Sequence, residues 1–160
     1  MADGEFTIEG WDEFVENFGK LADKWDAKKE VLLKRMGNTV LRKTKHYIPV
    51  DTSRLADNYH LDISDIKQDV VTIGTNVHYA LYVNDGHVQH ARFLPADKIR
   101  SAKKKKKYVK KGADGIMLKE SYVAGKHFVE KGLTDSKEPL ENLVNSFMEQ
   151  IKHEVEGGSL

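Results

Sequence analysis

Cysteine is absent from this 160-residue sequence, which has only three prolines and no long hydrophobic run. Without cysteine the chain has no disulfides, no thiol catalysis and no cysteine-ligated zinc. No apolar stretch approaches the roughly 20 residues that span a bilayer. Residues 1–10 contain acids instead of an apolar core, so we expect no signal peptide. These absences argue against a membrane protein, a disulfide scaffold and a zinc finger.

The composition is that of a soluble globular protein. Hydrophobic residues make up 39% of the chain and charged residues 32%, which separates it from fibrous and wholly disordered proteins. A chain of this length suffices for one domain of ordinary size with a real core. We therefore expect a single domain over residues 1–160.

The charge is distributed unevenly. Between Lys98 and Lys111 there are nine Lys or Arg residues and no acid. Subtracting these nine from the 26 basic residues leaves 17 against 25 acidic ones, a net charge of −8 for the rest of the chain. A mildly acidic body thus contains one strongly basic segment.

The first long segment, residues 11–47, has the apolar spacing of a helix. Its apolar residues recur at steps of three and four from Trp11 to Val40, which predicts one amphipathic stripe. Gly37 weakens the pattern and predicts a kink or a break. Pro49 should end the helix, because the residue before a proline disfavours helical torsions.

The middle of the chain favours a small sheet. Residues 51–53 resemble a turn or helix cap that leads into a short turn through Leu55. Alternating residues predict strands at 59–64 and 70–74, and a short polar link between them indicates an antiparallel hairpin. Residues 78–83 fit either a strand or one helical turn.

The remainder is predicted as a loop followed by a helix. Residues 87–121 contain the basic run and little periodicity, which predicts a long basic loop of the kind that is either functional or disordered. Apolar residues then step by three and four from Leu140 to Val155, with Pro139 in the first turn of the helix. The expected fold class is α+β: a long N-terminal amphipathic helix, a small antiparallel sheet, a long basic loop and a C-terminal amphipathic helix.

Catalytic chemistry finds little support in the residue pattern. The chain has neither a nucleophile elbow nor a glycine-rich phosphate-binding loop, so we expect no enzyme and no cofactor. Asp85, His87 and His90 have side chains that could hold a divalent metal. Exposed loop histidines explain the same residues better, and we assign no metal site.

Aromatic residues provide the candidate contact surfaces. A helical stripe that begins at Trp11 favours core or subunit packing over base stacking. Tyr79 and Tyr82 are large amphipathic side chains of a type enriched at interfaces, and core packing explains them equally well. The candidate interface residues are Trp11, Tyr79 and Tyr82.

The lysine run suggests electrostatic binding. Such a block can contact nucleic-acid phosphates without reading sequence, in a strongly salt-dependent way. Lysine runs also repel themselves and are often only solvated, and this second interpretation carries somewhat more weight. The candidate nucleic-acid-binding residues are Lys103, Lys104, Lys105, Lys106, Lys107, Lys110 and Lys111.

Three pieces in order resemble a known family. They are Ile48–Leu55 (IPVDTSRL), Gly74–His87 (GTNVHYALYVNDGH) and Tyr122–Val129 (YVAGKHFV), the last leading into the final helix. Over about residues 8–156 the chain is similar to the small neck and tail-completion proteins of tailed bacteriophages and prophages, which join head and tail. Ser53 stands where this family usually has glycine.

The resemblance implies a non-enzymatic virion component. It would lie between the head connector and the tail tube as a ring around the DNA conduit, with a hexamer as the expected form. Its implied partners are further copies of itself, a connector or head-closure protein, a tail terminator or tube protein, and DNA held non-specifically, but no membrane. It would assemble in the host cytoplasm. The alternatives are a connector-proximal head-closure protein and a nucleic-acid-binding protein that acts through the lysine run.

Overall fold

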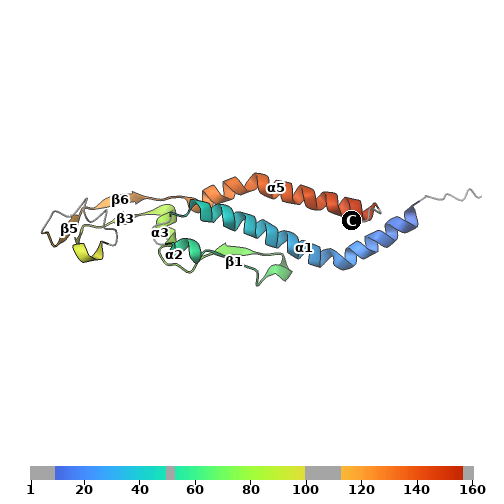
Figure 1. Ribbon diagram of the computed structural model, residues 1–160, viewed down its shortest axis with the longest axis horizontal. Coiled ribbons are helices and arrows are strands. Elements are labelled where there is room, and N and C mark those ends of the chain that lie inside the picture. The colour runs from blue at the N-terminus through green and yellow to red at the C-terminus, as the bar shows by residue number, and fades with distance from the viewer. Residues whose placement is uncertain (1–9, 50–52, 100–112, 157–160) are drawn as a thin grey trace, which may run out of the picture. The chain divides into compact units, whose positions relative to one another are not determined.

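The computed structural model describes residues 10–49, 53–99 and 113–156 (Figure 1). Long helices and small antiparallel sheets confirm the predicted α+β class. The chain forms two compact units. Unit 1 comprises Met1–Val77 and Phe128–Leu160, and unit 2 comprises His78–His127. Among the described residues no helix combines the length and the apolar character that crossing a bilayer requires.

Helix α1, Trp11–Tyr47, is a continuous helix of 37 residues in unit 1. Gly10 precedes it with φ +81°, and the acids Asp12 and Glu13 stabilise its first turn through the helix dipole. The helix ends just before Ile48 and Pro49, as predicted. The predicted break near Gly37 was wrong, because the helix runs through this glycine without interruption. Gly37 is buried against the Leu61 side chain.

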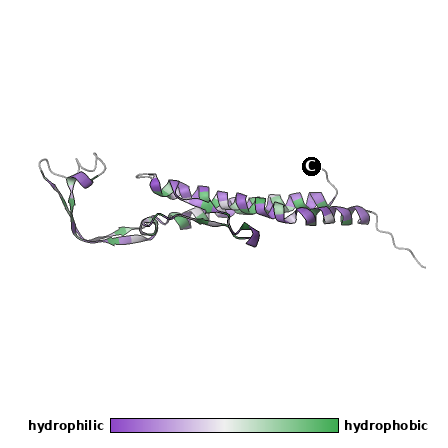
Figure 2. Ribbon diagram, turned by 90° about the horizontal axis from the view of Figure 1, so that it is seen from below, coloured by the Kyte–Doolittle hydropathy of each residue, from purple (hydrophilic) through white to green (hydrophobic). Residues whose placement is uncertain are grey.

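Helix α5, Phe128–Val155, packs antiparallel to α1. Near one end of the pair, Thr44 of α1 contacts Gly132 of α5. Towards the other end, the Lys28 ammonium lies 2.5 Å from the Glu154 carboxylate. Figure 2 shows hydrophobic residues along both helices, so this pair forms the framework of unit 1.

The predicted start of the last helix was wrong. The helix begins 11 residues before Pro139, at Phe128, so the proline lies in its interior. A proline there costs about 3 kcal/mol because one backbone hydrogen bond is lost. Burial of the first turns offsets this cost: Phe128 is 1% exposed and its ring meets that of Tyr59 edge-on at 5.9 Å. Full burial of an aromatic side chain stabilises the folded state by about 1.5–3 kcal/mol.

A short hairpin completes unit 1 and confirms the predicted one. Strands β1 (His60–Asp62) and β2 (Thr72–Gly74) pair antiparallel. The 3-10 turn η1, Ile66–Gln68, connects them, and helix α2, Arg54–Asp57, precedes them. Residues 51 and 52 of the predicted cap lie outside the described residues. The buried hydrophobic residues are Leu21, Ile48, Leu55, Tyr59, Ile66, Val77 and Phe128.

Unit 2 contains strands where a long loop was predicted. Helix α3 (Ala80–Asp85) resolves the open choice at residues 78–83 in favour of a helix. Strands β3 (Gly86–Gln89) and β4 (Arg92–Pro95) precede the 3-10 turn η2 (Ala96–Lys98), and β5 (Gly115–Leu118) and β6 (Ser121–Ala124) follow. β3 pairs with β6 and β4 with β5, both antiparallel, so the four strands form a two-stranded ribbon in two sections.

The predicted loop over 87–121 is therefore wrong where these strands lie. Each strand has only four residues, too few to produce a clear alternation in the sequence. Its partner also lies far along the chain: His87 pairs with Val123. Pairing at such a distance leaves no local signal.

Replacing Gly132 by alanine should destabilise the helix pair. A Cβ at this position would lie 2.5 Å from Thr44 Oγ1 and 2.6 Å from Thr44 Cα. We expect a loss of about 1–3 kcal/mol from overpacking. Gly19→Ala is the matched control, because nothing lies within 4 Å of a Cβ there, and it should stabilise the helix by about 0.5–1 kcal/mol. Thermal unfolding followed by circular dichroism should give opposite shifts; equal shifts would contradict this packing.

Tyr59 should make the protein less stable at alkaline pH. Burial, and secondarily the charge of Glu130, raises the pKa of Tyr59 above its ordinary value. Stability from this group is complete below about pH 10, the unfolded pKa, and is lost as the pH rises through the folded pKa. Tyr59→Phe should therefore lose less melting temperature than the unmodified chain between about pH 9 and pH 11. Identical losses in the two proteins would refute this role.

Candidate assembly surface

The N-terminal turns of α1 present an exposed row of aromatic rings, here called the aromatic stripe: Trp11, Phe14 and Phe18. These side chains are 56%, 41% and 56% exposed. The rings of Trp11 and Phe14 stack at 5.8 Å, and those of Phe14 and Phe18 at 6.2 Å. Their spacing of three and four residues puts them on one face of the helix. Trp11, which the sequence predicts as an interface residue, thus lies at the exposed end of the aromatic stripe.

The stripe is exposed because α5 ends early. Glu154, next to the last residue of α5, pairs with Lys28 of α1. The first turns of α1, which carry the stripe, extend past this end of α5, as Figure 1 shows in blue. Trp25 lies on the same face of α1 as the stripe, and its ring packs 6.1 Å from that of Phe147 in α5. The stripe therefore continues a helix-packing face beyond the helix that covers it.

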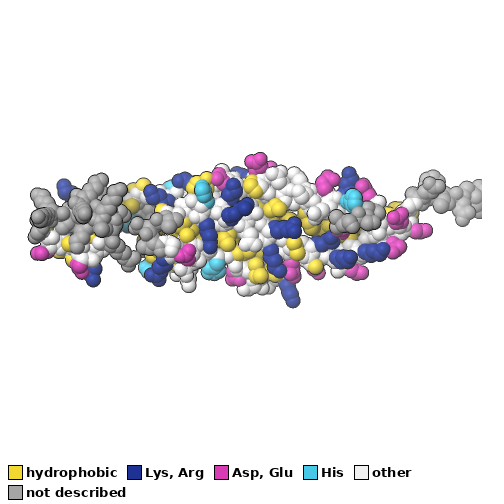
Figure 3. Space-filling model, viewed as in Figure 1, with side chains coloured by type: hydrophobic (Ala, Val, Ile, Leu, Met, Phe, Trp, Pro, Cys, Tyr) yellow, Lys and Arg dark blue, Asp and Glu magenta, His cyan; other side chains and the backbone are white. Residues whose placement is uncertain are grey.

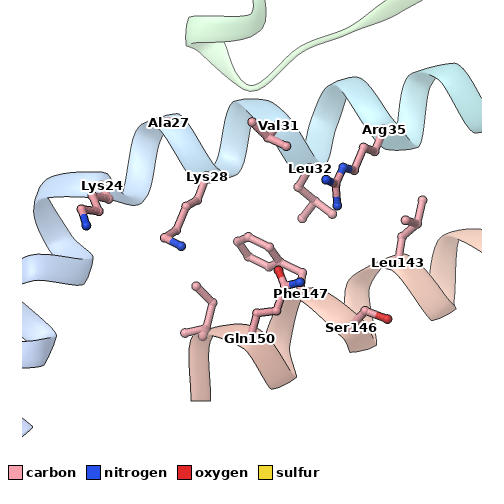
Figure 4. Close-up of a pocket in the computed structure, with 11 residues that line it drawn as sticks. Lys24, Ala27, Lys28, Val31, Leu32, Arg35, Leu143, Ser146, Phe147 and Gln150 are labelled. Atoms are coloured by element: carbon pink, nitrogen blue, oxygen red, sulfur yellow. The ribbon is translucent and has the colours of Figure 1, made fainter. Parts of the chain in front are cut away.

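A second surface, here called the interhelical groove, lies between α1 and α5 (Figure 4). It has a volume of about 410 Å³. Figure 4 shows the Phe147 ring between the two helices, with Lys28 and Arg35 of α1 beside it. Three cations and no acid contribute to its lining. The lining residues are Lys24, Ala27, Lys28, Val31, Leu32, Arg35, Leu143, Ser146, Phe147, Gln150 and Ile151.

The groove is amphipathic. Its floor is apolar and its cations lie on α1, of which Lys28 is paired with Glu154. Figure 3 shows hydrophobic side chains interspersed with Lys and Arg over the helices of unit 1. Such a surface favours an apolar partner that also carries acids.

The two predicted interface tyrosines belong to unit 2 and differ in exposure. Tyr79 is half-buried just before α3, where its ring meets that of His78 at 5.5 Å. Tyr82 is 56% exposed on α3 and its ring lies 5.8 Å from that of His87. Tyr82 therefore has the accessible surface that a contact needs, and Tyr79 has less of it.

The ribbon of unit 2 carries exposed apolar pairs that the sequence reasoning missed. Val88 pairs across the strands with Tyr122, and Phe93 with Met117. All four side chains are more than half exposed. An isolated two-stranded ribbon is marginal in water unless it packs against something else. Short apolar clusters on either side of the basic run were the available signal.

Hydrogen bonds attach the ribbon to α3. The Tyr122 hydroxyl donates to the Asp85 carbonyl at 3.0 Å. The backbone N–H groups of Lys126 and His127 donate to the carbonyls of Val83 and Asn84, both at 2.9 Å. These hydrogen bonds fix the position of the exposed apolar pairs relative to α3.

The residues weighed as metal ligands are not assembled into a site. Asp85 accepts a hydrogen bond from the Asn84 side-chain amide at 2.6 Å, and His87 contacts Tyr82. Within 10–49, 53–99 and 113–156 no three His, Asp or Glu side chains gather as ligands. The lysine candidates of segment 103–111 lie outside the described residues, in the stretch of chain between β4 and β5.

Comparison with known proteins bears on these surfaces. Residues 12–86 match the sequence model of the family described as "Bacteriophage HK97-gp10, putative tail-component". The chain resembles a phage tail component. The matched range includes the sequence piece at 48–55 and all but the last residue of the piece at 74–87, and it supports the resemblance to tailed-phage proteins expected from them. The piece at 122–129 lies beyond the matched range. No curated protein and no solved structure matches the chain significantly.

A tail component is a structural part of the virion and contacts other structural proteins of the phage. The match extends from α1 through α3, so it includes the aromatic stripe, the hairpin of unit 1 and Tyr82. A structural role agrees with the non-enzymatic protein that the sequence predicts.

Proposed function

We propose that this tail-component-like protein completes the tail and joins it to the head connector, as a ring around the DNA conduit. The observation that carries the proposal is the family match over residues 12–86. The ordered sequence pieces narrow it, because they resemble neck and tail-completion proteins in particular.

Unpartnered apolar surfaces support this proposal physically. A ring subunit needs two different faces for its neighbours and further surfaces for the parts above and below it. Unit 1 supplies the aromatic stripe and the interhelical groove. Unit 2 supplies the exposed ribbon and Tyr82. The chain thus has enough separate contact surfaces for a neck component.

Deleting the coding sequence from its phage or prophage tests the proposed position of the protein between head and tail. Electron microscopy of the lysate should reveal DNA-filled heads beside separate, finished tails. Intact infectious particles would contradict a virion role altogether.

A connector-proximal head-closure protein is the alternative within the same class. It needs the same contact chemistry at another level of the neck. Unfilled or leaking heads in the deletion lysate would favour it over tail completion, and tails of uncontrolled length would favour a role in the tail itself.

The exposed ribbon should be needed for incorporation into particles. Replacing Phe93 and Met117 together by serine removes one cross-strand apolar pair. Truncating a buried interface anchor costs about 2 kcal/mol or more, so we expect at least roughly a tenfold loss of infectious particles. The control replaces Ile63 and Val70, comparably exposed residues of unit 1, by serine. Equal titres for both variants would show that assembly does not depend on contacts of the ribbon.

We further propose that the basic segment between β4 and β5 contacts DNA. Nine Lys or Arg residues over 98–111 would bind phosphates by counterion release. Replacing Lys103, Lys104, Lys105, Lys106 and Lys107 by glutamine should flatten the salt dependence of duplex DNA binding by up to about 4–5 in log–log slope. The five arginine replacements are the control and should retain the slope. An unchanged slope in the glutamine variant would mean that the segment is only solvated and does not contact DNA.

A different class of function, a free nucleic-acid-binding protein, makes its own prediction. In that case the purified protein would bind DNA tightly without any phage partner, and the deletion lysate would contain intact particles.

A further inference from the structure

The second section of the ribbon in unit 2, strands β4 and β5, alternates between pairs that are hydrogen-bonded and pairs that are not. Pro95 has no N–H, so Pro95 and Gly115 cannot be a hydrogen-bonded pair. The Ala96 N–H donates to the Asp114 carbonyl at 2.7 Å, which makes this next pair a bonded one. Because bonded and non-bonded pairs alternate along antiparallel strands, the register of the whole section follows from these two pairs.

Both edges of this section present free hydrogen-bonding groups. Phe93 and Met117, two positions from Pro95 and Gly115, form a non-bonded pair like them. Their backbone N–H and C=O groups therefore point outwards, those of Phe93 along one edge and those of Met117 along the other. Within the described residues no third strand pairs with either edge. Such open edges are a template for pairing with another chain.

The side chains of the section are largely apolar on both faces. Phe93 and Met117 lie on one face and are 52% and 69% exposed. The opposite face carries one base and three half-buried aliphatic side chains: Arg92, Leu94, Ile116 and Leu118. A strand that pairs with either edge should therefore be largely apolar on both faces as well.

Strand β4 meets this condition as a partner for the free edge of β5. Strands β1 and β3 carry polar side chains at alternate positions, His60 and Asp62 in β1 and His87 and Gln89 in β3. The side chains of β4, by contrast, already pair with those of β5 within one copy. Every copy presents β4 at one edge and β5 at the other. The free edge of β5 therefore fits the free edge of β4 in a second copy.

We propose that β5 of one copy pairs antiparallel with β4 of a second copy, so that the ribbons of neighbouring copies form one continuous sheet. This inference rests on the proposed ring and names a contact that builds it. The contact places Phe93 of one copy opposite Met117 of the next, as a hydrogen-bonded pair. Each of these exposed side chains thus gains a lateral neighbour on its open side.

Ring symmetry decides between β4 and a second β5 as the partner. In a closed ring each copy is related to the next by rotation about one axis, so all ribbons point the same way. Because β4 and β5 run in opposite directions within a ribbon, β5 of one copy also runs opposite to β4 of the next. Pairing β5 with β5 would need a two-fold axis between two copies and would leave both β4 edges open.

The absence of cysteine permits a direct test. One variant carries Leu94→Cys and a second, with a size tag, carries Ile116→Cys. A chain with a single cysteine cannot form an internal disulfide, so any product joins two copies. Between copies, positions 94 and 116 would form a non-bonded pair with Cα atoms about 4.5 Å apart, which suits a disulfide. Mild oxidation of the mixture should therefore give heterodimers on non-reducing gels.

Controls separate the possible contacts. Each variant oxidised alone should remain monomeric, because equivalent strands of neighbouring copies would lie two strand spacings apart, about 10 Å, beyond the reach of a disulfide. A dimer from Ile116→Cys alone would overturn the proposal in favour of β5 against β5. Leu94→Cys mixed with Val70→Cys, an exposed residue of unit 1, should give no heterodimer, and equal yields for the two mixtures would also overturn it.

A second cysteine position keeps the test decisive. Leu118→Cys replaces Ile116→Cys if that variant fails to fold, and it also detects a register between copies that is shifted by two residues. Heterodimers of Leu94→Cys with either partner support the edge contact. The lack of a heterodimer with both partners overturns it.

The test distinguishes this contact from the proposed function. Oxidation is carried out on purified particles that contain both variants and on the concentrated mixture of full chains. Particles that contain both variants but yield no heterodimer overturn the edge contact and leave the neck role intact. A chain absent from particles overturns the neck role, and heterodimers in the concentrated mixture would still support the contact.

A backbone change provides a second readout. Met117→Pro, introduced into the Ile116→Cys chain, removes an N–H that the ribbon itself does not use, and Pro95 already occupies a position of this kind on the other edge. It should leave the circular dichroism unchanged and lower the heterodimer yield about fivefold, as expected for one lost hydrogen bond. Met117→Val keeps the N–H and should retain the yield. Equal yields for the two variants would contradict pairing through this edge.

Discussion

The close approach of α1 and α5 at Thr44 and Gly132 is the constraint on which the rest of unit 1 depends. A side chain at Gly132 would collide with the backbone of Thr44, so only glycine allows the helices to meet there. Ser136 is fully buried, and its hydroxyl donates a hydrogen bond to the Gly132 carbonyl at 2.6 Å. This contact sets the register, which in turn brings Lys28 opposite Glu154.

The same register determines which surfaces remain for partners. With α5 shorter than α1, 28 residues against 37, the helix pair cannot cover both ends of α1. The end left over carries Trp11 and Phe18, two of the large exposed apolar side chains of unit 1. Exposed aromatic rings in a row are costly to leave in water, and contact between subunits is the ordinary way in which structural proteins cover them.

Unit 2 repeats this logic with different elements. Its two-stranded ribbon gains stability from α3 through the bond between Tyr122 and Asp85, yet Phe93 and Met117 remain more than half exposed. A ribbon with such pairs suits a protein that is completed by its neighbours. The many uncovered apolar residues agree with the resemblance to phage tail components.

The sequence by itself determined the elements whose signal is local. The spacing of three and four after Trp11 predicts α1, and alternation around Leu61 and Ile73 predicts the β1–β2 hairpin, because each pattern lies within a few turns or one short link. Only the tertiary structure decided that α5 starts at Phe128, since burial against Tyr59 offsets the cost of an interior proline. It also decided the ribbon, whose four-residue strands pair across 20 or more residues of sequence and so leave no local periodicity. Whether the aromatic stripe is core or surface likewise depended on where α5 ends, which no spacing within α1 can reveal.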